Sequence, residues 1–574
     1  MDIKRTALWV VFTVSLLFLW DNWMRHTGQP SMFFPTAAQL SKANADGIPP
    51  VKSDVPQATA SSMGEAAVST PTGASTATAV QGEIITITTD LVKADIDTNG
   101  GKLVRLELLK HKESVKREWY AGYLALFGHD DNATPANDIV LFDHTATRTY
   151  LARTGLIGGP FPNHDSGFVA KPGPRSLDGG DQVQLVLESE QNGVKLIKTF
   201  TFKRDDYAID IQHTVVNNSG APIAPSLYLQ LLRDGSKAEG DTRFYSSFTG
   251  AATYATDAEH YQKLPFDKFR TAVNGRVEPM FATDNGWIAM VQHYFVSAFV
   301  PPEHAKREVI AQKMPDTNLY AISTILPLGT IAPGATASMD ARLYSGPEVA
   351  SQLEKITLGL DLVKDYSWLT IVAKPIFWLM EQIHKILGNW GWTIIGLTVV
   401  IKLAFFPLSA ASYRSMAKMK VVTPKMQSIR ERFKSDPQKM NQAMMELYKT
   451  EKINPLGGCL PILIQMPVFI ALYWVLSASV EMRNAPWLGW IHDLAAPDPL
   501  YILPLVMAVS MFIQTRLNPT PPDPVQAKVM MFMPVIFSVM FFFFPSGLVL
   551  YQIVNNALSI AQQWVITKKL GEAK

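Results

Sequence analysis

The stretch VMMFMPVIFSVMFFFFPSGLVLYQIVNNALSIAQQWVIT, residues 529–567, decides the fold class, because it carries no charged side chain over 39 positions. A helix that crosses a bilayer needs about 20 mostly apolar residues. The stretch is therefore too long for one span. Pro545-Ser546-Gly547 near its middle is a turn signal. We predict two spans here, near residues 527–544 and 548–567.

Other parts of the C-terminal third show the same uncharged, apolar character. Three windows there predict further spans near residues 389–409, 460–480 and 499–516. Together with the long stretch, they give five predicted spans in the last third of the chain.

A sixth span is predicted at the N-terminus, where Lys4 and Arg5 precede an uncharged run that ends at Trp20. This is the pattern of an export signal. No small-residue cleavage site adjoins the run, so we interpret residues 1–27 as an uncleaved signal anchor. A cleaved signal peptide is the alternative.

Lysine and arginine in short loops set the orientation of a membrane protein. The loop 408–459 is rich in both, whereas the loop 481–499 holds one arginine against three acidic residues. The C-terminal tail carries Lys568, Lys569 and Lys574. We therefore expect loop 408–459 and both termini in the cytoplasm, and the segment between the first two spans outside.

The external segment has three predicted parts. Residues 28–82 are rich in Ala, Ser, Thr, Pro and Gly and predict a flexible linker. Residues 83–345 alternate apolar and polar side chains, with an Asn192-Gly193 hairpin signal and a strand from Trp287 to Val300, and predict one large antiparallel β domain. Residues 346–388 predict an amphipathic helix, either on the outer membrane surface or packed on the β domain.

Composition narrows the function classes. The chain has 574 residues, of which 47% are hydrophobic and 18% charged, and its net charge is +2. This balance does not favour a DNA-binding protein. The single cysteine, Cys459, excludes an intramolecular disulfide. We find no metal-ligand spacing among the histidines and no phosphate-binding loop, so we predict no metal, cofactor or catalytic residue, and we interpret the β domain as a binding or scaffolding module.

Polar side chains inside the spans are candidates for function, because ionisable groups are costly within a bilayer. Lys402 lies in the predicted span 389–409, with Thr398 one turn earlier on the same face. A lysine that extends to the cytoplasmic interface is the alternative explanation.

The last span carries a polar stripe at helical spacing. Its members are Gln552, Asn555, Asn556, Ser559, Gln562 and Gln563, with Tyr551 above them. Other spans add Gln465 and a face made of Met507, Met511 and Gln514. A wet cavity around Lys402 would satisfy these groups, whereas polar contacts that hold helices together are the alternative.

The cytoplasmic loop predicts a basic, methionine-rich helical hairpin over residues 410–456. Methionine suits surfaces that accept varied apolar partners. The side chains that mark it are Met416, Met419, Met426, Arg430, Arg432, Met444 and Met445. Anionic lipid, ribosomal RNA and a hydrophobic peptide are all possible partners, and a solvated positive loop is the plain alternative.

Several of these segments together resemble the YidC family of membrane protein insertases. The motifs are Asn454-Pro455-Leu456-Gly457-Gly458-Cys459 followed by Gln465-Met466-Pro467, Phe544-Pro545-Ser546-Gly547-Leu548, and the hairpin from Met416 to Tyr448. The resemblance is close over about residues 348–570, and the anchor and external domain match the long Gram-negative type in layout.

The resemblance implies a polytopic α-helical membrane protein with six spans and a periplasmic β-supersandwich domain. Residues 389–570 form its five-helix core, which encloses a hydrophilic groove. The groove charge is typically arginine in the family and is Lys402 here, so a bidentate grip on a carboxylate is lost. A family tyrosine pair corresponds to Tyr551 and Gln552. The implied groove and substrate contacts are Thr398, Lys402, Gln465, Met466, Phe469, Met507, Met511, Gln514, Tyr551, Gln552, Asn555 and Asn556.

The resemblance also implies a function and partners. The chain is expected to insert and help fold nascent inner-membrane proteins, alone or with the Sec translocon. The ribosome or the signal recognition particle pathway would deliver them at the cytoplasmic hairpin, and the phospholipid bilayer would receive them. A solute transporter or channel with a periplasmic ligand-binding domain is the alternative, and a static scaffold leaves the hairpin and the stripe unexplained.

Overall fold

The computed structural model describes residues 55–56, 82–113, 137–236, 248–256, 260–270, 276–315, 317–364, 366, 369–433, 436–451, 460–517 and 524–572. The described residues up to 364 form a compact β unit, and those from 366 onward form a compact helical unit. The predicted anchor 1–27, nearly all of the predicted linker 28–82, and the motif Asn454–Cys459 lie outside the described residues.

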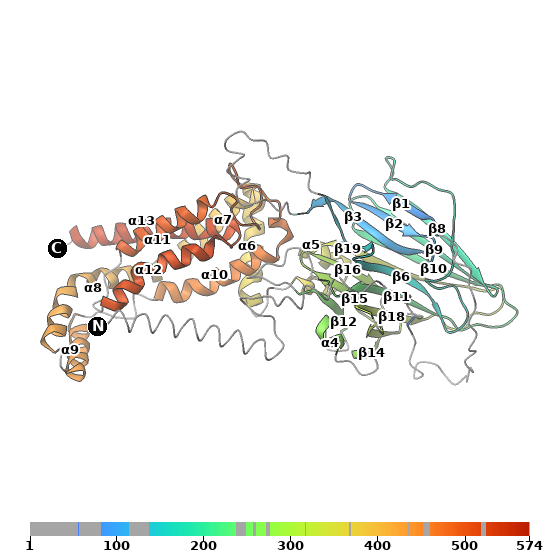
Figure 1. Cartoon of the computed structure of the whole chain (residues 1–574), viewed down its shortest axis with the longest axis horizontal. Helices are drawn as coiled ribbons and strands as arrows, with labels where there is room; N and C mark the ends of the chain where they lie inside the picture. Colours follow the sequence, from blue (N-terminus) through green and yellow to red (C-terminus); the bar gives the residue numbers. More distant parts are fainter. Residues whose placement is uncertain are drawn as a thin grey trace. The chain divides into compact units, whose positions relative to one another are not determined.

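The β unit consists of two large antiparallel sheets (Figure 1). The first sheet has the strand order β1 (Ile84–Thr88), β2 (Val92–Asp97), β3 (Lys102–Lys112), β6 (Thr149–Ile157), β11 (Ser226–Asp234), β18 (Leu319–Pro327), β17 (Arg307–Lys313), β14 (Arg276–Thr283), with β4 (Asp138–Val140) on β3 and β5 (Asp143–His144) on β6. The second has the order β13 (Tyr261–Pro265), β12 (Gly250–Tyr254), β15 (Trp287–Gln292), β16 (Phe295–Val300), β19 (Thr336–Pro347), β10 (Ala208–Asn217), β9 (Val194–Lys203), β8 (Gln182–Gln191), β7 (Val169–Ala170). A short helix, α4 (Phe266–Arg270), follows β13.

The sequence pattern explains most of these strands. Alternate side chains of β9 are buried, as the period of two requires. Asn192 and Gly193 both have positive φ and join β8 to β9, with Gln191 opposite Val194. This is the two-residue hairpin that an Asn-Gly pair favours.

The prediction of one strand from Trp287 to Val300 is wrong. The structure places two strands there, β15 and β16, with Ile288 opposite Phe299. The chain reverses at His293-Tyr294, where Tyr294 has a φ of 69°. Nearly every side chain in both strands is buried, so the run shows no alternation of polar and apolar positions. The polar residues at the turn, Gln292 and His293, are themselves buried, and the pair is not a turn signal of the Gly, Pro or Asn type.

Two basic side chains cross between the sheets. Lys198 on β9 is fully buried, and its Nζ donates to the carbonyl oxygens of Gly100 at 2.7 Å and Thr154 at 2.8 Å. His213 on β10 is also fully buried, and its Nε2 lies 2.8 Å from Thr154 Oγ1. Buried polar groups that are hydrogen-bonded in this way fix the register of the two layers.

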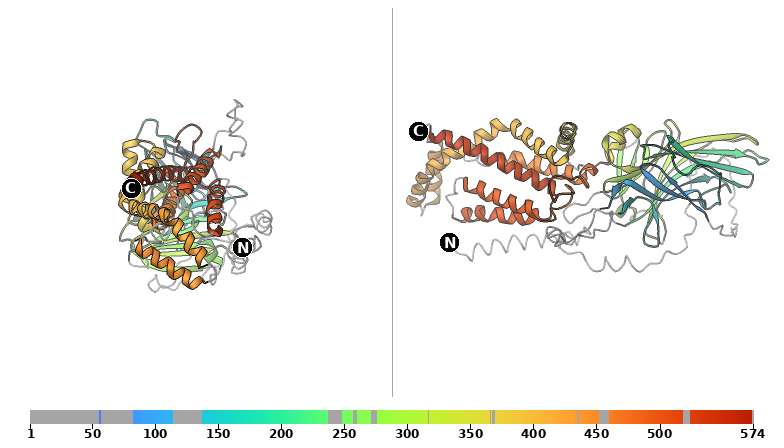
Figure 2. Two further views of the ribbon diagram at one scale, coloured as in Figure 1. Left: turned by 90° about the vertical axis from the view of Figure 1, so that its left-hand side faces the viewer. Right: turned by 90° about the horizontal axis from the view of Figure 1, so that it is seen from above.

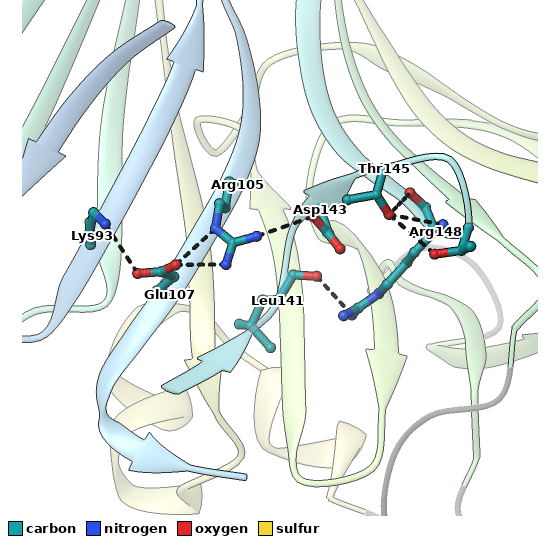
Figure 3. A network of polar contacts seen from close by, with 8 residues as sticks. Lys93, Arg105, Glu107, Leu141, Asp143, Thr145 and Arg148 are labelled. Carbon is teal, nitrogen blue, oxygen red and sulfur yellow. Dashed lines mark hydrogen bonds and ion pairs between the residues drawn. The ribbon is translucent and has the colours of Figure 1, made fainter. Parts of the chain in front are cut away.

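A partly exposed ion-pair network lies on the first sheet (Figure 3). Arg105 on β3 contacts Glu107 at 2.7 Å and Asp143 on β5 at 3.4 Å. Lys93 on β2 reaches Glu107 from the other side, at 3.6 Å. Such solvent-accessible pairs contribute about 0–1 kcal/mol each, so they support the strand order without determining it.

Helices follow the β strands along the chain. They are α5 (Ala350–Ile356), the 3-10 turn η2 (Leu360–Val363), α6 (Thr370–Leu387), α7 (Trp390–Ala404), α8 (Phe406–Arg432), α9 (Pro437–Thr450), α10 (Leu460–Ala478), the 3-10 turn η5 (Val480–Met482), α11 (Ile502–Leu517), α12 (Pro524–Phe541) and α13 (Ser546–Glu572). In the helical unit, α13 packs along α7 and α11, and α10 packs along α6 (Figure 2). Their apolar side chains form one core that includes Phe377, Leu397, Leu472, Met507 and Leu548.

The prediction of a single helix over 346–388 is wrong. The stretch is divided into α5, η2 and α6, and the break lies at Gly359, whose φ is 76°. α5 already ends at Ile356, where Thr357 is extended, and Gly359 precedes η2 in a left-handed conformation that only glycine adopts readily. A second junction joins α6 to α7, where Gly388 ends one helix and the Asn389 side chain accepts from the Trp392 N–H at the start of the next.

No single described helix is both long enough and apolar enough to count as a complete membrane span by itself. One pair, α7 with α8, passes that test together and bends by 68° between Ala404 and Phe406. The predicted span 389–409 is therefore not one straight helix. Pro407 lies in the first turn of α8, where its missing N–H costs nothing, and it favours a new helix start over continuation of α7.

His213 makes the stability of the β unit depend on pH. Burial lowers the pKa of its imidazole to about 3, and the Lys198 ammonium acts in the same direction. The unfolded state therefore binds one more proton than the folded state between about pH 6.5 and pH 3, so acid destabilises the fold. We expect the free energy of unfolding to fall by about 2 kcal/mol more from pH 7 to pH 5 in the wild type than in His213→Gln. Hydrogen exchange of β9 and β10 peptides in the whole chain under urea measures it, and parallel pH curves for the two proteins would contradict the assignment.

Candidate functional site

The polar stripe of α13 faces the inside of the helical unit. Asn555, Asn556, Ser559 and Gln563 are at most 3% exposed. Gln552 and Gln562 are partly buried. Since buried polar groups need partners, the question is which neighbouring helix supplies them.

One branch of the stripe reaches Lys402 and Gln465. The Lys402 Nζ on α7 donates to Ser559 Oγ at 2.7 Å. Ser559 Oγ donates in turn to the Asn555 backbone carbonyl at 2.7 Å. Gln465 Nε2 on α10 donates to Asn555 Oδ1. We call Lys402, Gln465, Asn555 and Ser559 the lysine cluster, and it joins three helices.

A small pocket opens beside the lysine cluster. Its lining comes from α7, the first turn of α8, and α10, namely Ile401, Lys402, Phe405, Leu408, Ser409, Gln465 and Val468. Lys402 and Gln465 belong to both the pocket and the cluster. The bend between α7 and α8 therefore places a cation and two uncharged polar side chains at one hollow in an otherwise apolar bundle.

The other branch of the stripe turns toward α11. Gln552 Nε2 donates to Asn556 Oδ1 at 2.9 Å, and Asn556 Nδ2 donates to Ser510 Oγ at 3.0 Å. Ser510 Oγ donates to the Met507 carbonyl at 2.7 Å. Ser510 lines the apolar groove described below, and the other side chains line neither that groove nor the pocket at Lys402. This branch holds two helices together.

The apolar groove lies between α11 and α13. Its lining is Leu505, Val506, Val509, Ser510, Ile513, Ile553, Ala557, Ile560, Ala561 and Trp564. The two hollows beside α13 thus differ in chemistry. One contains a lysine and a glutamine, and the other is almost wholly hydrocarbon.

The remaining predicted groove residues are distributed over several environments. Thr398 is buried, and its hydroxyl donates to the Ile394 carbonyl of its own helix at 2.7 Å. Met507 is fully buried in the apolar core, and Met511 packs against that core. The structure therefore does not bring these three to the pocket.

The last four predicted groove residues are Tyr551, Phe469, Met466 and Gln514. Tyr551 is 1% exposed, and its ring centroid lies 6.4 Å from that of Phe469. Met466 is 47% exposed, and Gln514 is partly buried. Met466 alone of these four offers a substantial accessible apolar surface.

The methionines of the hairpin mostly pack within it. Met426 is 3% exposed and forms a small cluster with Met419 and Met444. Met416 is also buried, whereas Met445 is 55% exposed. The methionine face predicted from the sequence is thus largely used to hold α8 against α9.

Basic side chains cover the outside of the hairpin. Arg432 is exposed, and its guanidinium lies 5.6 Å from the Phe433 ring centroid. Arg430 is partly buried. Lys425 pairs with Glu451 at 2.6 Å, which ties the end of α9 to α8.

Sequence reasoning missed the residues that close the other end of the bundle. Asp498 is 1% exposed; its Oδ1 accepts from Trp490 Nε1 at 2.9 Å and its Oδ2 from the Leu503 N–H at 2.7 Å. Ser546 Oγ donates to the Asp493 carbonyl at 2.9 Å. The loop before α11 is therefore bound to the first turn of α13. The available signal was an acidic residue just ahead of an apolar helix.

Ser510 and Asn556 provide a test of the structural branch. Removing the hydroxyl in Ser510→Ala leaves Asn556 without its interhelical acceptor, so we expect the helical unit to lose about 0.6–1.7 kcal/mol of stability. In an Asn556→Ala background the same change is expected to cost much less. Unfolding in mixed micelles completes this double-mutant cycle, and additive losses would show that the two side chains do not interact.

The comparisons with known proteins cover almost the whole chain. The family model described as 60Kd inner membrane protein matches residues 382–573, and the model described as YidC periplasmic domain matches residues 84–120 and 122–379. The proteins named membrane protein insertase YidC from Janthinobacterium sp. (strain Marseille) and Herminiimonas arsenicoxydans are each 60% identical, with all of both chains covered. The protein of that name from Cupriavidus necator is 57% identical and covers all of this chain and 99% of its own.

Two of the matching solved structures are of low similarity to this chain. An active YidC insertase with its first transmembrane domain resolved has a TM-score of 0.38 at 17% identity, covering 84% of this chain and 93% of its own. A galactose mutarotase-like protein from Lactobacillus casei has a TM-score of 0.29 at 11% identity, covering 46% of this chain and 100% of its own. On the family models and the full-length relatives, the chain belongs to the YidC family of membrane protein insertases, an inner-membrane family with a periplasmic domain.

Proposed function

We propose that this chain inserts and helps fold nascent inner-membrane proteins, and that the lysine cluster with its pocket is where their hydrophilic segments enter. The observation that carries this proposal is the position of Lys402. Its ammonium points to α13 and lines a pocket that also holds Gln465 and Ser409. The relatives of this chain are named as insertases, and those names support the same activity for it.

The physical problem of insertion is the cost of moving polar groups through hydrocarbon. A polar group that crosses without partners loses several kcal/mol of hydration. A pocket within the bundle that presents Lys402, Ser409 and Gln465 shortens the apolar path that such a group must cross. An acidic tail gains further from the cation, because charges attract more strongly where water is excluded.

The driving force comes from the substrate itself. Each Leu, Ile, Phe or Val that enters the bilayer contributes roughly 0.3–0.6 kcal/mol. The membrane potential adds about 2.3 kcal/mol per 100 mV for each negative charge that moves outward. The protein therefore has to lower a barrier rather than supply energy.

The arrangement in the membrane is part of the proposal. We infer six spans, with both termini in the cytoplasm and the β unit in the periplasm, from the distribution of lysine and arginine. The basic hairpin α8–α9 would then face the cytoplasm. Its exposed cations suit an anionic partner such as ribosomal RNA, which would agree with delivery by a ribosome or the signal recognition particle pathway. Cooperation with the Sec translocon is the expected role for larger substrates.

A charge reversal at Lys402 tests this proposal. In Lys402→Glu a carboxylate replaces the cation, so an acidic tail meets repulsion. We expect insertion of a two-span substrate with an acidic tail to fall by about tenfold or more, while Lys402→Arg, which keeps the charge, stays within about twofold of wild type. Protease protection of the translocated loop in sealed liposomes measures this.

The control is the same substrate with its tail acids replaced by amides. Its insertion is expected to change little in Lys402→Glu. An acidic tail that inserts equally well with either charge at position 402 would contradict an electrostatic role for this residue.

A further inference from the structure

Lys402 has an uncharged partner. Its Nζ donates to the Ser559 hydroxyl at 2.7 Å, and within the described ranges no carboxylate forms an ion pair with it. A carboxylate partner would neutralise the ammonium. A hydroxyl partner leaves its positive charge intact.

The orientation of the Ser559 hydroxyl is set by a contact other than the one with Lys402. A serine hydroxyl has one proton to donate and two lone pairs that accept. Its proton is directed to the Asn555 carbonyl at 2.7 Å, so a lone pair is left to accept from Lys402. Asn555 is itself held to α10 by Gln465. The Tyr413 side chain on α8 also hydrogen-bonds Ser559. The acceptor is therefore held by contacts from α8, α10 and α13, none of which carries the lysine.

Without this acceptor, Lys402 has other conformations open to it. A lysine has a long flexible stem, and near the end of a membrane helix it extends toward the aqueous interface. Lys402 lies in the last turn of α7, where that extension is easy. The bond to Ser559 instead keeps the ammonium inside the bundle. It occupies one of three N–H donors, which leaves two for a ligand in the pocket.

We propose that Ser559 is the positioning residue for Lys402, and that it sets the selectivity of the pocket for segments with acidic side chains. This rests on the proposed function. The positioning role of Ser559 means that α13 helps to recognise acidic segments of the substrate, in addition to packing against its neighbouring helices. It also explains how a single-point cation serves where the fork of an arginine is missing.

The test uses the purified whole chain in sealed liposomes and two substrates that differ only in having an acidic or an amide tail. In Ser559→Ala we expect insertion of the acidic-tailed substrate to fall by about fivefold, with the amide-tailed substrate within about twofold of wild type. Ser559→Thr keeps the hydroxyl and is expected to restore the acidic substrate. In a Lys402→Met background, Ser559→Ala is expected to cause no further loss.

A matched control is Ser538→Ala. Ser538 is a buried serine on α12 whose hydroxyl donates to the Pro504 carbonyl, away from Lys402. It is expected to leave the ratio of acidic to amide insertion unchanged. Equal losses for both substrates in Ser559→Ala, or a loss that persists without Lys402, would assign Ser559 to packing alone and overturn the inference.

The two proposals fail differently. If neither substrate becomes protected from protease in liposomes that contain the wild-type chain, the proposed function fails. If it protects both and Ser559→Ala matches wild type on the acidic tail, only the positioning role of Ser559 fails.

Discussion

The hydrogen bond from Lys402 to Ser559 is the interaction on which the helical unit depends, because it keeps a cation inside an apolar bundle. An ionisable group at the centre of a membrane helix costs about 2.5–3.5 kcal/mol on insertion scales, so a lysine kept inside the bundle needs compensating contacts. The lysine cluster supplies them from α10 and α13 with uncharged side chains. These uncharged partners leave its positive charge without a neutralising carboxylate. The bend after α7 places Lys402 at the pocket, and the inward face of α13 supplies its acceptor.

The β unit solves a related problem without a ligand site. Lys198 is held by backbone carbonyls between the sheets, and burial lowers its pKa well below the usual range. His213 lies beside it in a neutral form. Both groups therefore connect layers within a closed core. Lys402 differs because it lines a pocket instead of a closed core.

The sequence predicted the elements better than the contacts. The period of 3.6 correctly placed Asn555, Asn556 and Ser559 on one face of α13, because that spacing is a property of the helix itself. It gave no information on the neighbours, and so it did not separate Asn556, which binds Ser510 on α11, from Ser559, which binds Lys402 on α7. Met507 was a reasonable candidate for an accessible face, but tertiary packing buries it completely. The sequence marks the breaks at Gly359 and before Pro407 by one residue each. The apolar pattern continues on both sides of each residue, so the prediction ran one helix through Gly359 and one span through Pro407.

The most direct test of the central claim is photo-crosslinking from inside the pocket. A photoreactive residue at Leu408 lines the pocket, and a matched one at Val509 lines the apolar groove between α11 and α13. Both positions are exposed and apolar. During insertion into liposomes, the hydrophilic tail of the substrate is expected to crosslink at position 408 and not at 509. Crosslinks of that tail at 509 alone would contradict an entry route past Lys402.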